Sequence, residues 1–267
     1  MSEFDDILKE AVDYVVRHGF DGTLEFSSLI NRLRNAAEAT ATPERVVKEK
    51  MGKYLEGVFD KAVSNRGIRK AFSTLPVVTI DKIKPELRAE LDRRILANAQ
   101  LIKINREQAI DKTLQRFSGW TTSVPKDAHA INKNEVIADI KKPLEQLRYE
   151  NNRRNIDQGH KLIESVNAVI GIQTNAIAVR WQSRWRRPGY DFREDHKELD
   201  GKVFAIRGNW AIEKKLMNKG AGYSDSIVQP AQLPFCSCSW EYISTLSQLP
   251  DDMITKKGRD ALNAIGQ

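Results

Sequence analysis

Residues 86–117 form a long run of strong helix formers, and this run constrains the fold more than any other feature. Apolar residues recur along it as a stripe, and neither Gly nor Pro interrupts it. Pro85 precedes the run, at the place where a helix tolerates proline best. We therefore predict a long helix that begins at Pro85, with a break near Ile104–Asn105.

The residues before this run are also expected to be helical. Apolar residues at helical spacing between positions 4 and 16 predict a first helix, which Gly19 ends. Further helices are expected at residues 27–39 and 42–64, with Thr42 as the N-cap of the latter. Together these patterns predict a helical N-terminal region.

The segment Ser118–Pro125 is the expected boundary between two parts of the chain. After it, one helix is expected at residues 134–148, broken or kinked at Pro143. Another is expected at residues 153–170, with Gly171 as its C-terminal cap.

After Gly171 the pattern changes to short apolar segments between loops rich in Gly, Pro, Asn and Asp. These segments predict short strands at residues 176–181, 203–206, 227–228 and 236–242. The fold class is therefore α+β: a mainly helical N-terminal region followed by a small mixed α/β domain with a short-stranded sheet. The predicted limits are 1–120 for the helical region, 121–245 for the second domain, and 246–267 for a polar C-terminal tail with a short helix.

The chain carries a formal net charge of +7, which is unevenly spread. Its first fifty residues hold 10 acidic and 7 basic side chains, so the basic excess lies further along. A basic protein can meet nucleic acid or another acidic partner, although charge alone fits a protein without either.

The cellular compartment is predicted from the absence of membrane-spanning and signal sequences. It has no run of about 18 apolar residues that would span a membrane. Its N-terminus is acidic and does not resemble a signal peptide. We therefore expect folding in a cytoplasm, where Cys236 and Cys238 stay thiols.

A cluster of arginines and tryptophans is the strongest candidate for contact with nucleic acid. Arginine binds phosphate through a planar fork, and tryptophan stacks on bases or guanidinium groups. The same pattern also fits contact with an acidic protein, or arginines stacked on buried tryptophans. The candidate residues are Arg180, Arg184, Trp185, Arg186 and Arg187, with Trp181 between the first two.

A polar segment before the second expected strand holds His196 and the turn Asp200–Gly201. Glycine accepts a positive φ there, and Asp200 can bond its own backbone. His196 is open to three interpretations: a metal ligand, a general base, or a structural hydrogen-bonding residue.

Cys236 and Cys238 form a Cys-x-Cys pair. On a strand both thiols would share one face with backbones about 6.5 Å apart, too far for a relaxed disulfide. In a loop the pair could bind zinc with His196 as a third ligand, and no fourth ligand is evident. The alternative is two small buried side chains in the core.

Familiar enzyme signatures are missing from the sequence. It contains no Gly-x-Ser-x-Gly, no phosphate-binding glycine loop and no His-Glu-x-x-His. A nucleophilic cysteine paired with His196 is conceivable, but nothing in the sequence predicts the oriented base it needs. We therefore expect no enzymatic activity and no required cofactor, with zinc as the one candidate ion.

These motifs, in this order, resemble the minor head proteins of tailed phages typified by protein F of phage Mu. The resemblance covers roughly residues 85–242 and includes the helix from Arg153–Arg154 and the strand with Trp181. Its motif residues are Arg193, His196, Leu199, Asp200, Gly201, Cys236 and Cys238. The chain departs from the family at Ser237, where arginine is usual, and its first 80 residues lie outside the resemblance.

The resemblance implies a structural minor capsid protein of the phage head. Such a protein would bind the portal vertex or the capsid interior and assist head assembly or genome delivery. Its expected partners are the portal protein, the major capsid protein and packaged double-stranded DNA, with no membrane in the assembled head. It would lie in the virion, inside the head, after assembly in the host cytoplasm. The alternative is a DNA-binding protein that acts on phage genome ends without a capsid role.

Overall fold

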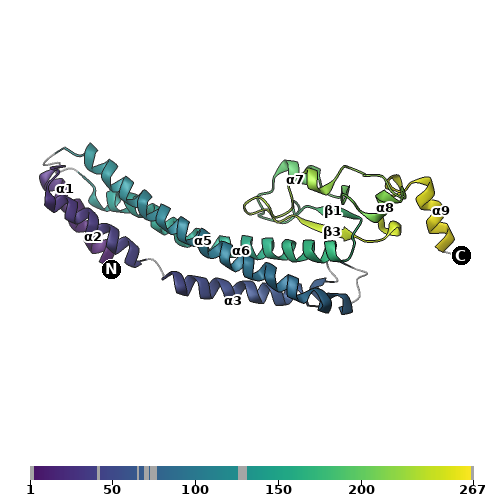
Figure 1. Ribbon diagram of the computed structural model, residues 1–267. Coiled ribbons are helices and arrows are strands. Elements are labelled where there is room, and N and C mark those ends of the chain that lie inside the picture. Colours follow the sequence, from purple (N-terminus) through teal and green to yellow (C-terminus); the bar gives the residue numbers. More distant parts are fainter. Residues whose placement is uncertain are drawn as a thin grey trace. The chain divides into compact units, whose positions relative to one another are not determined.

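The computed structural model describes residues 3–40, 43–64, 66–68, 72, 77–125 and 131–265. The chain is α+β, as predicted: mainly helical, with one three-stranded antiparallel sheet (Figure 1). The α-helices whose limits fall within the described residues are α1 (Glu3–His18), α2 (Leu24–Thr40), α3 (Glu44–Ala62), α5 (Val77–Ser123), α6 (Lys133–Gln173), α7 (Glu194–Glu198), α8 (Trp210–Glu213) and α9 (Lys256–Ile265). The strands are β1 (Ala178–Gln182), β2 (Val203–Ala205) and β3 (Ser239–Ile243).

The chain folds into two compact units, and each is built from two separate stretches of sequence. Unit 1 comprises residues 1–51 and 96–153, and unit 2 comprises residues 52–95 and 154–267. Both α5 and α6 contribute residues to both units. The predicted domain limits followed the order of the chain and therefore do not coincide with these units.

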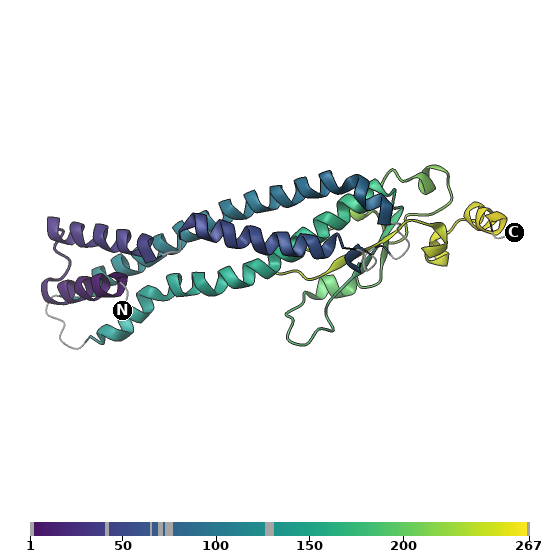
Figure 2. The ribbon, with the colours of Figure 1, turned by 90° about the horizontal axis from the view of Figure 1, so that it is seen from below.

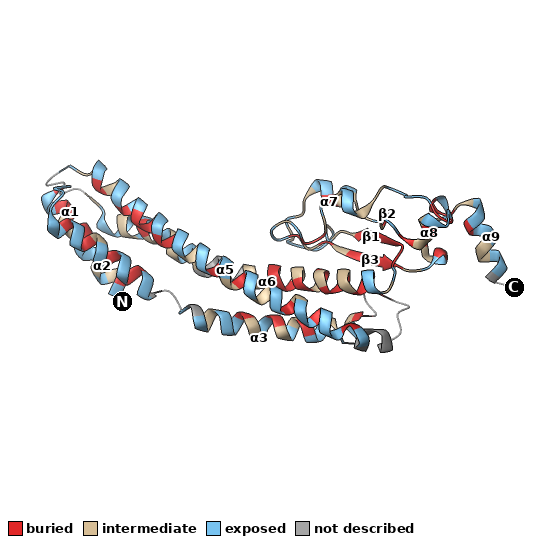
Figure 3. Cartoon of the chain, viewed as in Figure 1, coloured by how far each residue is buried: buried red, intermediate tan, exposed pale blue. Residues whose placement is uncertain are grey.

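The core of unit 1 forms because α1 buries one face. Phe4, Leu8, Val12 and Val15 recur every three or four residues and are fully or almost fully buried. They pack with residues of α2, with Ile110, Leu114 and Phe117 of α5, and with Ile140 of α6. Figure 3 shows the buried residues of α1 and α2 alternating with exposed ones along each helix. The first two predicted helices are confirmed.

Two prolines predicted to begin or break helices lie inside them instead. The helix predicted to start at Pro85 begins at Val77, and the two helices predicted on either side of residue 150 are one, with Pro143 inside it. Figure 2 shows both long helices as continuous coils. Each proline lacks one backbone donor and its ring crowds the preceding turn, a local cost of about 3 kcal/mol that a long packed helix can absorb.

Other boundary predictions have different outcomes. No break occurs at Ile104–Asn105, where the Asn105 side chain donates to the Leu101 carbonyl at 2.7 Å. The segment Ser118–Pro125 is helical as far as Ser123, so the helix extends beyond the predicted start of this boundary. The predicted N-cap, Thr42, lies outside the described residues.

In the sheet, β1 lies between β2 and β3 and pairs antiparallel with both. The predicted strands at residues 176–181 and 203–206 are confirmed. The strand predicted at residues 227–228 is wrong, because the Gln229 side chain closes a local turn there by donating to the carbonyls of Ser224 and Ile227. The strand predicted at residues 236–242 begins only at Ser239, which leaves both cysteines in the preceding loop.

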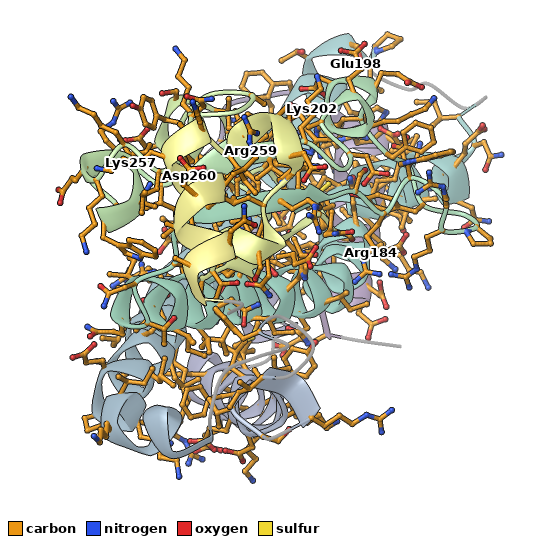
Figure 4. All side chains as sticks on the ribbon, turned by 90° about the vertical axis from the view of Figure 1, so that its right-hand side faces the viewer. Arg184, Glu198, Lys202, Lys257, Arg259 and Asp260 are labelled. Carbon is orange, nitrogen blue, oxygen red and sulfur yellow. The ribbon has the colours of Figure 1, made fainter. Side chains whose placement is uncertain are left out.

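The end of the chain belongs to the core of unit 2. Two 3₁₀ turns, Leu246–Gln248 and Asp251–Met253, bury Leu246, Leu249 and Met253 in a cluster with Ile177 and Ala178 of the sheet region. Helix α9 follows, with Lys257, Arg259 and Asp260 labelled on it in Figure 4. The predicted polar tail at residues 246–267 therefore contributes buried apolar side chains as well.

Candidate functional site

Three segments of unit 2 that are far apart in sequence meet beside β1. They are residues 181–186, residues 193–204 and residues 234–238. Each holds part of the motif pattern found in the sequence, and each is fixed by hydrogen bonds to the others.

Asp200 joins the first two segments. Its carboxylate accepts the Ser183 N–H at 2.8 Å, the Trp185 indole N–H at 3.0 Å and a guanidinium N–H of Arg186 at 3.1 Å. Burial raises the pKa of Asp200, but these donors and the Arg186 charge outweigh it and leave the pKa below its usual value. The carboxylate therefore holds the loop after β1 in place.

Gly201 completes this turn. Its φ is 78°, in the left-handed region that glycine adopts without strain. Its N–H donates to the Trp181 carbonyl at 2.8 Å, and the Trp181 N–H donates to the Lys202 carbonyl at 2.9 Å. Leu199 closes α7, and its carbonyl accepts the Lys202 N–H at 2.9 Å. The turn therefore sets the register of β2 against β1.

His196 lies on α7 and points into the protein. Only 2% of it is exposed, and its ring meets the Trp181 ring edge to face with centroids 5.2 Å apart. Its Nδ1 lies 3.4 Å from the Cys236 sulfur and 3.6 Å from the Cys238 sulfur. The structure thus brings together the three residues that the sequence proposed as metal ligands.

The loop that carries the cysteines is held from several sides. Arg193 donates to the Pro234 carbonyl at 3.0 Å, and the Asp157 carboxylate accepts the Phe235 N–H at 2.7 Å. His160 bonds the Cys238 carbonyl through Nε2 at 2.7 Å. The Tyr190 hydroxyl accepts the Ser237 N–H at 2.9 Å.

Asp157, His160 and Tyr190 were not predicted as site residues from the sequence. Asp157 and His160 are three residues apart on α6, a spacing that places them on one side of the helix. No local pattern indicates that they bind a loop almost eighty residues later.

The two thiols differ in acidity. The neighbouring Cys238 thiol lowers the pKa of Cys236, and the same contact raises the pKa of Cys238. Each cysteine is only 1% exposed. A nucleophilic role requires that a substrate reach the sulfur, and this conformation gives no such access.

Glu164 is a second buried acid in this unit. It accepts the Trp240 N–H at 3.1 Å and so ties α6 to β3. Its burial raises the pKa of Glu164 to about 8, although the Trp240 N–H and the Asn167 side chain oppose the shift. The carboxyl group is therefore largely protonated at neutral pH.

The arginine and tryptophan cluster is partly used within the protein. Arg180 pairs with Glu241 at 3.0 Å, and Arg186 pairs with Asp200 and stacks on the Trp185 ring. Within the described part of the chain, Arg184 and Arg187 are exposed and form no ion pair. Figure 4 shows Arg184 well apart from α9. Two of the four arginines are thus left to meet solvent or a partner.

Comparison of the chain with protein-family models, curated proteins and solved structures finds no match. Among the described residues, no helix is long and apolar enough to cross a membrane.

Proposed function

We propose that the chain is a structural minor capsid protein of a tailed-phage head, which binds the portal vertex or the capsid interior. The observation that carries the proposal is that the motif residues hold separate segments of the chain together. Arg193, His196 and Asp200 each contact a segment distant in sequence, so the motif pattern corresponds to one folded unit. The resemblance to proteins typified by phage Mu protein F rests on this same set.

The way these residues are used favours a structural role over catalysis. The Asp200 carboxylate accepts three hydrogen bonds from its own chain, and His196 contacts the two buried cysteines. A catalytic group needs at least one face directed at a substrate. Here the Asp200 carboxylate and the Nδ1 atom of His196 are directed at other parts of the fold.

The helical part offers surface for a partner protein. On α5, the residues Leu96, Leu101 and Ile104 are large apolar side chains that stay exposed. Apolar residues on an exposed helix are typical contacts for a helix or groove of a partner. We propose the portal protein and the major capsid protein as these partners.

A second candidate function is binding of phage DNA ends without a capsid role. The observation that favours it is the pair Arg184 and Arg187, whose exposed guanidinium groups are free to bind phosphate. A head protein would use the same two guanidinium groups to bind packaged double-stranded DNA. The two functions are therefore distinguished by where the chain is found.

Mass spectrometry of gradient-purified particles of the encoding phage separates them. We expect the chain in filled heads, at few copies relative to the major capsid protein. Comparison with particles after DNA ejection then tells whether the chain leaves with the genome. Its absence from filled heads would overturn the head-protein proposal and favour the DNA-end function.

A further inference from the structure

Two sulfurs and one imidazole nitrogen converge in unit 2 around a single point. The ligand atoms of His196, Cys236 and Cys238 all lie within 4.8 Å of one another, and all three residues are buried. The Nδ1 atom of His196 is 3.4 Å from one sulfur and 3.6 Å from the other.

These distances match the spacing of ligands around a tetrahedral zinc ion. Zinc bonds of about 2.3 Å to sulfur and about 2.0 Å to nitrogen place those two atoms about 3.5 Å apart at the tetrahedral angle. Both observed sulfur–nitrogen distances lie within 0.1 Å of this value. The placement of the imidazole relative to each sulfur therefore fits a shared metal ion, and all three ligand atoms lie within reach of one.

The backbone beside one of the sulfurs suits a thiolate. The Ala231 N–H donates to the Cys236 sulfur at 3.4 Å. A backbone donor at this place stabilises the negative charge on a sulfur that binds metal.

The imidazole ring of His196 makes its polar contacts on one side. Its Nδ1 faces the two sulfurs, whereas Nε2 is buried and has no hydrogen-bond partner among the described residues. The ring is therefore oriented with one nitrogen toward the space that the sulfurs share.

We propose that Cys236, Cys238 and His196 bind one zinc ion through two thiolates and Nδ1. Two sulfurs and one imidazole form a ligand set that zinc prefers over magnesium or calcium, which take oxygen ligands. A fourth ligand, such as water, completes the coordination. The ion joins α7 to the loop before β3, so it stabilises the fold whatever the partner of the whole protein is.

The test measures zinc bound to the purified full-length chain, expressed with added zinc and then passed through gel filtration. We expect one zinc per chain. Cys236→Ser, Cys238→Ser and His196→Ala should each bind zinc about tenfold more weakly or worse. The matched control is His18→Ala, a histidine of α1 outside the cluster, which should keep one zinc per chain.

Cobalt substitution of the unmutated chain keeps the test valid if a variant fails to fold. We expect one equivalent of Co²⁺ to give the near-ultraviolet sulfur-to-cobalt absorption of a thiolate site, and Zn²⁺ to displace it. A folded chain with no such band and no bound zinc would overturn the proposal, as would full zinc retention in the cysteine variants. None of these results depends on whether the chain is found in phage heads.

Discussion

Asp200 shows how a single carboxylate can organise a loop. It accepts hydrogen bonds from Ser183, Trp185 and Arg186, which belong to the loop that follows β1. We predict that Asp200→Asn lowers the free energy of unfolding by about 1–3 kcal/mol, because the amide loses the charge and one acceptor position. Guanidinium unfolding followed by circular dichroism measures the change.

The matched control is Asp195→Asn, on the exposed face of α7. An exposed carboxylate contributes little, so its change should stay within about 0.5 kcal/mol. Equal effects of the two substitutions would show that the Asp200 hydrogen bonds do not stabilise the loop.

Glu164 predicts a pH dependence of stability. Its pKa of about 8 in the folded protein exceeds the value of about 4.3 expected in an unfolded chain. Between these values the folded state holds a proton that the unfolded state has lost. The contribution of Glu164 to the free energy of unfolding is therefore greatest below pH ~4.3. It falls by up to about 1.4 kcal/mol per pH unit as the pH rises to about 8.

Glu164→Gln should remove this dependence, because the amide cannot ionise and can still accept the Trp240 N–H. We expect the variant to be more stable than the unmutated chain at pH 8, as measured by denaturant unfolding between pH 5.5 and 8. The exposed Glu213→Gln on α8 should keep the original slope. Parallel curves for the unmutated chain and Glu164→Gln would contradict the assignment.

At the level of elements, the long helices could be predicted and their limits could not. The spacing of the apolar residues between Phe4 and Val16 identified α1, because all of these residues belong to one helix and lie on its buried face. Pro85 and Pro143 predicted a start and a break, since local propensity penalises proline inside a helix. Packing along the rest of each helix outweighs that local cost, and packing cannot be read from a short window of sequence.

The sequence predicted the three residues of the candidate site, but it did not predict the residues that hold their loop in place. His196, Cys236 and Cys238 stood out by residue type, and the structure brings them together. Their loop was expected on a strand, but the backbone of Phe235 has a positive φ, which interrupts extended structure just before Cys236. The residues that hold this loop, such as Asp157, act across the fold and leave no local signal.

Gly171 and Gly119 give a paired prediction for the helices. A Cβ on Gly171 of α6 would lie 2.3 Å from two ring atoms of Tyr242, whose ring also stacks on Phe72. Gly171→Ala should therefore destabilise the protein by about 1–3 kcal/mol. At Gly119 of α5 a Cβ meets nothing within 4 Å, so Gly119→Ala should stabilise it by about 0.5–1 kcal/mol. Thermal unfolding of both variants measures the two signs, and the same sign for both would contradict the packing of α6 on β3.

For the whole molecule, the net charge belongs to one unit. Unit 1 holds 17 basic and 17 acidic residues, whereas unit 2 holds 26 basic and 19 acidic residues. Unit 2 therefore carries the entire charge of +7, and any attraction to a polyanion should act on it.

We predict that the full chain binds duplex DNA with an affinity that falls steeply as salt rises. The double variant Arg184→Gln, Arg187→Gln should reduce the slope of log affinity against log salt by up to about 2, because each arginine neutralises one phosphate. Fluorescence anisotropy with a labelled duplex measures it. The control is Lys103→Gln with Lys112→Gln, two exposed lysines of unit 1. An unchanged slope in the arginine variant would show that this pair does not bind the DNA.

The division of unit 2 into two stretches has a consequence for synthesis on the ribosome. Residues 52–95 emerge early, with apolar side chains such as Leu55, Leu87 and Leu91 that are fully buried in the finished protein. Contacts such as Arg94 with Ser165 and Phe72 with Tyr242 form only after the later stretch has been made. At the usual speed of translation, β3 follows residue 95 by roughly 7 to 30 s. During that interval the apolar side chains of residues 52–95 lack their packing partners. We therefore expect a ribosome-associated chaperone to shield this stretch of the nascent chain.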